Sequence, residues 1–149
     1  MDQSQFDLIM QRHAQYLARG EPARYQAVFY AEDDLTALEL AGVDFTGAKL
    51  HGTNLAGVDL CRCKFGKALL RDVDLSSAAL RGTDFCNARL EGVKLDGADL
   101  HRANFRGARL ADVTLKMANV QGVDFTQARR KNVDFGCSDR EARQRGARI

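Results

Sequence analysis

Residues 98–107 read Ala98-Asp99-Leu100-His101-Arg102-Ala103-Asn104-Phe105-Arg106-Gly107 and contain two copies of one five-residue pattern. Each copy has a small residue, then a polar residue, then a large apolar residue at its centre. In steps of five from Leu40 to Phe135 there are twenty such centres, and all are Leu or Phe except Val120 and Arg130. The pattern therefore organises about two thirds of the chain.

A period of five fits neither an ordinary helix nor an ordinary strand. Helices repeat every 3.6 residues and strands every 2.0, so either would scatter these centres around its surface. The positions two residues before each centre hold nothing larger than Val after Leu38, which is the size limit of a crowded interior. The sequence therefore predicts a chain that turns once per five residues, as in a repeat solenoid that buries its apolar side by stacking.

A second period of twenty residues lies within the first. The Ala positions of one column recur at this interval, and so do five Phe centres, which we predict to form a structural core file: Phe45, Phe65, Phe85, Phe105 and Phe125. Twenty residues is therefore one coil of four sides, with like residues stacked on like. At a strand spacing of 4.7–4.9 Å, about five coils make a rod about 24 Å long.

These units resemble those of a known family. Ala103-Asn104-Phe105-Arg106-Gly107 is similar to the A-(D/N)-(L/F)-X-G unit of pentapeptide-repeat proteins, and residues 98–102 and 48–52 each depart from it at one position. The resemblance implies an all-β solenoid, a right-handed four-sided (quadrilateral) β-helix of about five coils. It implies little about activity, because family members do many things. It also implies an end-to-end homodimer through the C-terminal coil.

The repeats divide the chain into three predicted segments: an N-terminal helix and lead-in cap (1–37), the β-helix (38–136) and a polar tail (137–149). In the first segment apolar residues from Phe6 to Leu17 recur at helical spacing, which predicts a capping α-helix over the first coil. Asp2 or Ser4 is expected to cap its start, and Gly20 with Pro22 to end it. Docking of a partner by this helix is the alternative.

Residues 22–37 are expected to form a loose lead-in wrap or a short helix. Ala23/Tyr25, Val28/Tyr30 and Asp33/Leu35 keep the register of five, but Tyr is too large for an inward centre and Asp33 is unsuited to an inward position. The three tyrosines at this end, Tyr16, Tyr25 and Tyr30, indicate packing at the cap or, alternatively, a binding patch.

The C-terminal end of the repeat is expected to be open. Arg130 occupies an inward centre, where an unpaired charge carries a large penalty, so the last coil should be open at that corner. Ser138 to Glu141 has capping-box spacing and predicts a short helix to about Arg145. This tail is expected to be too polar to form a good lid, which leaves this end for self-association or disorder.

The sequence shows no combination of residues that indicates catalysis, a metal or a cofactor. Cys63 falls at an inward position and Cys61 on the surface, so a shared metal is not expected, and free thiols suit a reducing cytoplasm. No nucleophile, base and acid converge, and the glycines are turn residues rather than a phosphate loop. No apolar run approaches the length of a membrane span. The chain has 149 residues and a net charge of +2, which by itself indicates neither a nucleic-acid coat nor an acidic decoy.

One side of the predicted coil is distinctly basic. We call the side centred on Leu50, Leu70, Leu90, Leu110 and Arg130 the basic face; its flanking residues include six bases and three acids, a net charge of +3, against 0, 0 and −1 on the other sides. A solvated surface is the simpler interpretation, and docking of an acidic protein surface or another polyanion is the functional one. The candidate partner-binding residues are Lys49, Arg71, Arg89, Arg109, Arg129 and Lys131.

Three function classes remain. We expect a non-enzymatic binding or scaffold solenoid with an unidentified protein partner and without a cofactor, a specific nucleic acid or a membrane. A topoisomerase-interacting mimic of duplex DNA, a role of some relatives, would require a strongly negative rod. A purely structural accessory module is the third class.

Overall fold

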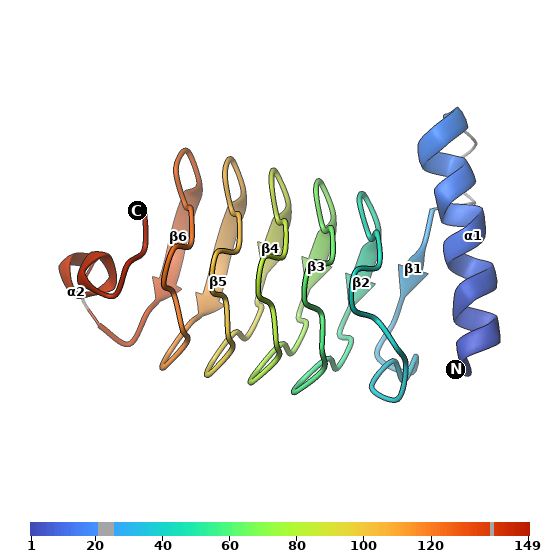
Figure 1. Ribbon diagram of the computed structural model, residues 1–149, viewed down its shortest axis with the longest axis horizontal. Helices are drawn as coiled ribbons and strands as arrows, with labels where there is room; N and C mark the ends of the chain where they lie inside the picture. The colour runs from blue at the N-terminus through green and yellow to red at the C-terminus, as the bar shows by residue number, and fades with distance from the viewer. Residues whose placement is uncertain (21–25, 138) are drawn as a thin grey trace.

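The chain forms a parallel β-solenoid of about five turns with a helix at each end (Figure 1). The computed structural model describes residues 1–20, 26–137 and 139–149. Helix α1 is Gln3–Arg19 and α2 is Asp139–Gln144. One parallel sheet runs along the solenoid in the order β1 to β6, with bounds Val28–Phe29, Lys49–His51, Leu69–Arg71, Arg89–Glu91, Arg109–Thr114 and Arg129–Asp134.

The register of the coils follows the twenty-residue period of the sequence. Leu50 pairs with Leu70, and the same step continues from coil to coil to Arg130 in β6. Three further files of isolated parallel bridges, among them Asp44–Lys64, mark the other sides. The solenoid therefore has four sides, of which the one formed by β1 to β6 is its basic face.

Backbone hydrogen bonds make each five-residue unit a turn and join it to the next coil. Within a unit, Ala48 N donates to Phe45 O at 2.9 Å; between coils, Phe45 N donates to Lys64 O at 2.7 Å. The second residue after a centre commonly has a left-handed backbone, as in Gly42 (φ 76°) and Arg62 (φ 60°). Glycine adopts this conformation without a Cβ penalty, which explains why it recurs at this position.

The interior is a set of stacked files. The rings of Phe45, Phe65, Phe85, Phe105 and Phe125 lie in one file with centroids 4.6–5.1 Å apart and nearly parallel planes. These separations match the spacing between strands, because each ring is carried by one coil. Every ring in the file is buried.

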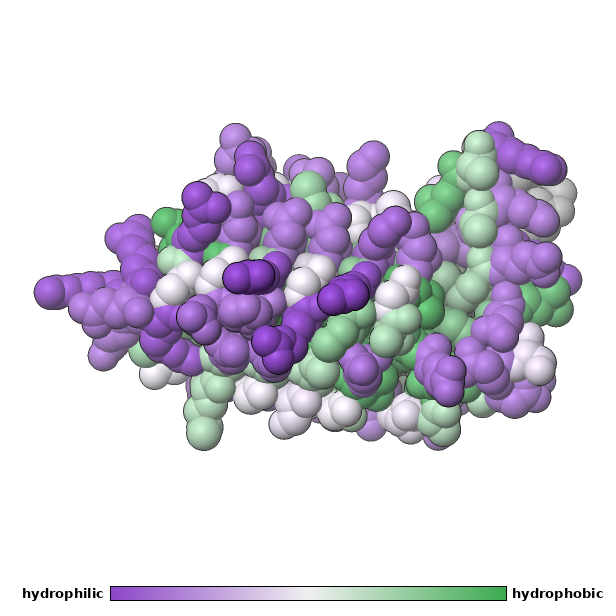
Figure 2. Space-filling view, in the orientation of Figure 1, coloured by the Kyte–Doolittle hydropathy of each residue, from purple (hydrophilic) through white to green (hydrophobic). Residues whose placement is uncertain are grey.

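Helix α1 closes the N-terminal end. Asp2 is the N-cap in a capping box with Gln5, and Gly20 ends the helix in a left-handed conformation, while Pro22 lies outside the described residues. Phe6 is buried and stacks on Phe29 at 5.8 Å. Hydrophobic side chains appear along α1 and where it meets the first coils (Figure 2). The prediction of a capping helix is confirmed, although Leu17 is 40% exposed rather than packed on the coil.

His13 fastens this cap to the solenoid. Its ring is buried, Nε2 lies 2.9 Å from Thr46 O, and Nδ1 accepts a hydrogen bond from Ala27 N at 3.2 Å. Burial lowers the pKa of His13, against the opposing effects of the Thr46 hydrogen bond and of Asp44. His13 is therefore a neutral packed residue with its proton on Nε2.

The expected register of the lead-in is wrong by one residue. Phe29, not Tyr30, points inward, and Tyr30 is 49% exposed and stacks on His51 at 5.7 Å. Phe29 and Leu35 are six residues apart and both buried, and the extra residue is absorbed where Tyr30 N donates to Asp33 Oδ2. The lead-in is therefore neither a loose wrap nor a short helix at this point, because β1 pairs with β2 in the sheet. Tyr25 lies outside the described residues.

The expectation that the tail makes no lid is also wrong. Phe125 N donates to Arg148 O and Arg148 N to Val123 O, so the tail continues the stacking on one side of the last coil. Ala142 and Ala147 are buried there. Small apolar residues and backbone pairing are sufficient for this contact, which needs no apolar helix face. The predicted cap at Ser138 lies outside the described residues.

No helix within the described ranges has both the length and the apolar character needed to cross a membrane.

Candidate functional site

The outer surface of the sheet carries the six candidate residues in two rows. Parallel pairing with a step of twenty residues places each flanking residue beside its equivalents in the next coils. The residues before each centre form one row and those after it form a second. The first row is Lys49, Leu69, Arg89, Arg109 and Arg129, and the second is His51, Arg71, Glu91, Ala111 and Lys131.

Three arginines stand side by side in the first row. Arg89 pairs in register with Arg109, and Arg109 with Arg129, and all three side chains are exposed. We call these three residues the arginine row. None of them makes an ion pair with an acid of the described part of the chain. The arginine row is therefore available to a negative group from outside.

The structure does not bring all six candidates into one site. Arg71 is neutralised by Glu91, whose Oε2 lies 2.9 Å from Nη2 and 3.1 Å from Nε of the arginine. Lys49 is half-buried, and Leu69 separates it from the arginine row. Available positive charge is therefore concentrated on β4, β5 and β6, in the C-terminal half of the sheet.

A hollow of about 270 Å³ lies beside the arginine row. Ala111 occupies the second row between Glu91 and Lys131, and its small side chain leaves the space that a longer one would fill. The other residues that line the hollow are Arg89, Leu90, Arg109, Leu110, Arg129 and Arg130. Six of the nine residues that line the hollow are charged, of which five are basic and one, Glu91, is acidic.

Arg130 belongs to this site although sequence reasoning treated it as a defect. It pairs in register with Leu110 but is exposed, and its guanidinium carbon lies 5.9 Å from the centre of the Phe135 ring. The sequence signal was a charged residue at a centre that is otherwise apolar. Its position on the basic face, next to Arg129 and Lys131, was the clue to a functional interpretation.

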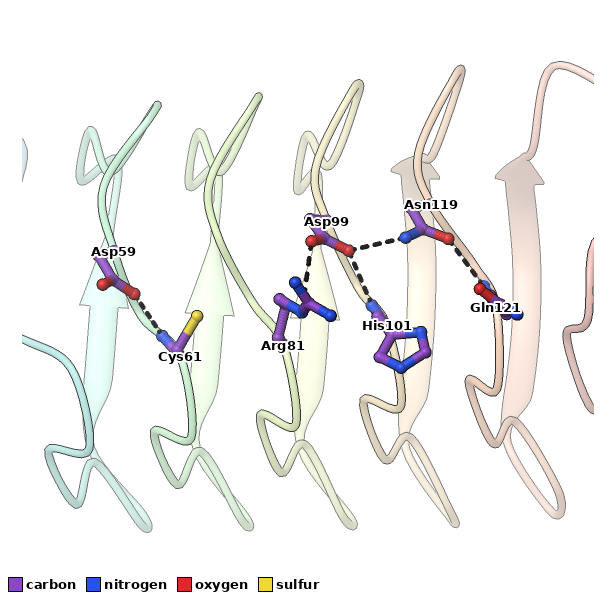
Figure 3. A network of polar contacts seen from close by, with 7 residues as sticks. All are labelled: Asp59, Cys61, Arg81, Asp99, His101, Asn119 and Gln121. Atoms are coloured by element: carbon purple, nitrogen blue, oxygen red, sulfur yellow. Dashed lines mark hydrogen bonds and ion pairs between the residues drawn. The ribbon is translucent and has the colours of Figure 1, made fainter.

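On the side of the solenoid in Figure 3, several polar side chains have partners within the chain. Arg81 Nε lies 3.7 Å from Asp99 Oδ2, and Asp99 Oδ1 accepts a hydrogen bond from Asn119 Nδ2 at 2.9 Å. Asp59 Oδ1 accepts one from Cys61 N at 2.9 Å, a turn contact that recurs along this side. Arg81 on this side thus has an acid of the chain beside it, unlike the members of the arginine row.

Cysteines and histidines are dispersed. Cys63 is buried, its thiol donates to Leu40 O at 2.9 Å, and burial raises its pKa to about 11. Cys61 is only half-buried, so the two thiols have different environments, as the sequence predicts. Across residues 1–20, 26–137 and 139–149, no three side chains of His, Cys, Asp or Glu are grouped to hold a metal ion. The arrangement offers ion pairing rather than nucleophilic or metal chemistry.

Comparison with known proteins agrees with the repeat. A family model described as pentapeptide repeats matches eight copies over residues 34–66, 68–107 and 88–127. A search of the curated proteins finds no match.

Solved structures of other proteins are similar to part of this chain. HetL, a pentapeptide repeat protein involved in heterocyst differentiation regulation from the cyanobacterium Nostoc, is 30% identical with a TM-score of 0.62, covering 77% of this chain and 46% of HetL. A pentapeptide repeat protein from the Arabidopsis thaliana thylakoid lumen is 28% identical with a TM-score of 0.51, covering 63% of this chain and 69% of its own. This chain thus spans less than half the length of HetL.

QnrB1, a plasmid-mediated fluoroquinolone resistance protein, resembles this chain in fold alone. A trypsin-treated form is 17% identical with a TM-score of 0.54, covering 83% of this chain and 77% of its own.

Proposed function

Because the chain belongs to the pentapeptide-repeat family, we propose that it is a non-enzymatic binding solenoid that docks an acidic protein surface on its basic face. Proteins of this family are generally structural or binding proteins rather than enzymes. The observation that carries the proposal is the arginine row, three exposed arginines in register that no described acid neutralises.

The arginine row is costly to the fold. Like charges directly opposite each other on neighbouring strands are destabilising. On the same face Arg71 is paired with Glu91, so the scaffold accommodates an acid opposite a base. An external negative partner accounts for three arginines that repel one another in the free protein.

An acidic protein suits this face better than duplex DNA does. The arginines are carried on strands about 4.8 Å apart, which is too close to match successive phosphates of a DNA strand simply. A mimic of duplex DNA would need dense negative charge, and no side of this solenoid has a net charge below −1. We therefore favour docking of an acidic protein over binding of duplex DNA, and over a topoisomerase-interacting role as a mimic of DNA. We also favour a cytoplasmic location, because the four cysteines are free.

We retain the end-to-end homodimer as a second, separate proposal. β6 is the last strand in the order of the sheet, and the tail pairs with the coil at Val123 and Phe125 instead. An edge strand is a surface on which a strand of a second copy can pair. Sedimentation equilibrium should then give a dimer mass, and a monomer mass at all concentrations would reject this proposal.

Charge reversal tests the docking proposal. The variant with Arg89→Glu and Arg109→Glu should lose binding to soluble polyglutamate, measured at low salt, while its circular dichroism and unfolding temperature stay close to those of the parent protein. The matched control is Arg62→Glu with Arg102→Glu, two exposed arginines on another side, which changes net charge equally. Equal loss of binding in both variants would reject a specific role for the basic face.

A further inference from the structure

We propose that the acidic partner presents an α-helix, which lies along the solenoid axis over the arginine row and inserts one carboxylate into the hollow beside Ala111. The inference rests on the proposed function and specifies the secondary structure of the partner at that same site.

The spacing of the arginine row selects a helix. Its members occupy three successive strands, so at 4.7–4.9 Å per strand it spans about 9.6 Å along the axis. A helix rises 1.5 Å per residue, and residues i, i+3 or i+4, and i+7 share one face. Carboxylates at those positions span about 10.5 Å. Three acids on a helix therefore face three arginines with a mismatch of about 1 Å.

An extended partner fits poorly in the same direction. On a strand, side chains of one face recur every two residues, about 6.7 Å apart, so three acids span about 13.4 Å. The excess over the arginine row is about 4 Å, nearly one coil. A strand laid across the axis would instead follow a single coil and meet Arg89 together with Glu91, or one other pair. An extended segment cannot engage all three arginines at once.

The hollow of about 270 Å³ has room for a carboxylate side chain beside the arginine row. Arg109 and Arg129 stand on one side of it and Lys131 on the other, with Ala111 between. Glu91 also lines the hollow, but its carboxylate is paired with Arg71. A carboxylate from the middle of the helix would meet guanidinium groups, which bind carboxylates in a bidentate manner. Ala111 thus makes room for the central acid.

Defined peptides of equal length and equal net charge test the inference. The first carries Glu at i, i+3 or i+4, and i+7 on one helical face; the second has the same composition with Glu spread around the helix; the third is held extended by prolines. Fluorescence anisotropy at one fixed low salt concentration gives each Kd. We expect the first peptide to bind at least about tenfold more tightly than the others, which is about 1.4 kcal/mol.

Variants of the protein test where the helical peptide binds. Ala111→Leu should fill the hollow and weaken the first peptide several-fold with no change in the unfolding temperature. Ala79→Leu is the matched control and should leave the Kd unchanged, because Ala79 is a half-buried alanine that pairs with Asp59 and Asp99 on another side of the solenoid.

The outcomes separate the two proposals. Equal affinity for all three peptides, or tighter binding of the extended one, would reject a helical partner but would not contradict the proposed docking of an acidic protein surface. An unchanged Kd in Ala111→Leu overturns insertion into the hollow. Failure of every acidic peptide to bind, or full binding to the Arg89→Glu/Arg109→Glu variant, overturns the proposed function itself.

Discussion

The two ends of this solenoid are finished in different ways. At the N-terminal end, α1 places Phe6 against Phe29 and His13 into hydrogen bonds with the first coils. At the C-terminal end, the last centre of the basic face is the exposed Arg130, and the tail covers a different side of the coil. Packing of α1 on the first coils stabilises the N-terminal end, whereas the C-terminal end retains exposed positive charge.

The coils of the basic face also differ from one another along the solenoid. From Leu50 to Leu110 the centres of the basic face are buried leucines, and Arg71 is paired with Glu91. From β4 to β6, by contrast, the arginine row, Arg130 and Lys131 place positive charge around a hollow. This contrast between neutral and charged coils along one repeat is what supports the proposed docking surface.

The largest expected effect distinguishes the middle of the core from its C-terminal end. Phe85 lies between rings at 5.1 and 4.6 Å, so Phe85→Ala should destabilise the protein by about 3–5 kcal/mol, measured by urea unfolding. Phe125 has one ring neighbour at 4.9 Å and an edge contact with Phe135 at 5.6 Å. Phe125→Ala should cost less, because the end relaxes more easily. Equal losses would contradict a weaker C-terminal end.

Acid should loosen the N-terminal end first. Because burial lowers the pKa of His13 below the ordinary 6.5, the unfolded chain binds a proton more readily than the folded one. The contribution of neutral His13 is fully present above pH 6.5 and is lost as the pH falls through the folded pKa. The unfolding free energy should therefore decline below pH 6.5, above the range where carboxylates titrate.

A matched variant isolates this effect. His13→Gln keeps one donor and one acceptor in the side chain but does not titrate. The decline between pH 6.5 and pH 5 should disappear in this variant. If it persists unchanged, His13 is not its source.

Two buried threonines provide a smaller test within the core. Thr83 Oγ1 donates to Leu60 O at 2.9 Å, whereas Thr53 Oγ1 is buried without a partner in the described structure. Thr53→Val should stabilise the protein by about 1 kcal/mol, and Thr83→Val should cost about 0.5–1.5 kcal/mol. Thermal unfolding of the pair measures both, and a shift of the same sign in both would show that the hydroxyl partner does not decide the outcome.

Much of the fold was predictable because its repeat is local. Each five-residue unit makes its own turn, and each twenty-residue coil contacts the next, so the spacing of Leu and Phe determines the stacking. The same logic predicts that Arg89, Arg109 and Arg129 lie in one row. Cys63 inside and Cys61 outside followed from the same register.

Features outside the strict repeat could not be predicted in this way. The one-residue insertion between Phe29 and Leu35 moved Phe29 inward, and no periodic signal marks where a turn absorbs an extra residue. The tail returns to pair through backbone groups of Arg148, which side-chain composition does not reveal. The hollow depends on the contrast between Ala111 and its neighbours in other coils, which needs the cross-strand register as well as the sequence.

The most direct test of the central claim is a paired measurement on Arg109→Gln. If the arginine row serves a partner and not the fold, removing its middle charge should raise the unfolding free energy by a few tenths of a kcal/mol through lost repulsion. The same change should weaken polyglutamate binding several-fold. Arg81→Gln, which loses the ion pair with Asp99, should instead lower stability by about 0.2–1 kcal/mol and leave binding intact. A destabilised Arg109→Gln that binds as well as the parent protein would contradict the claim.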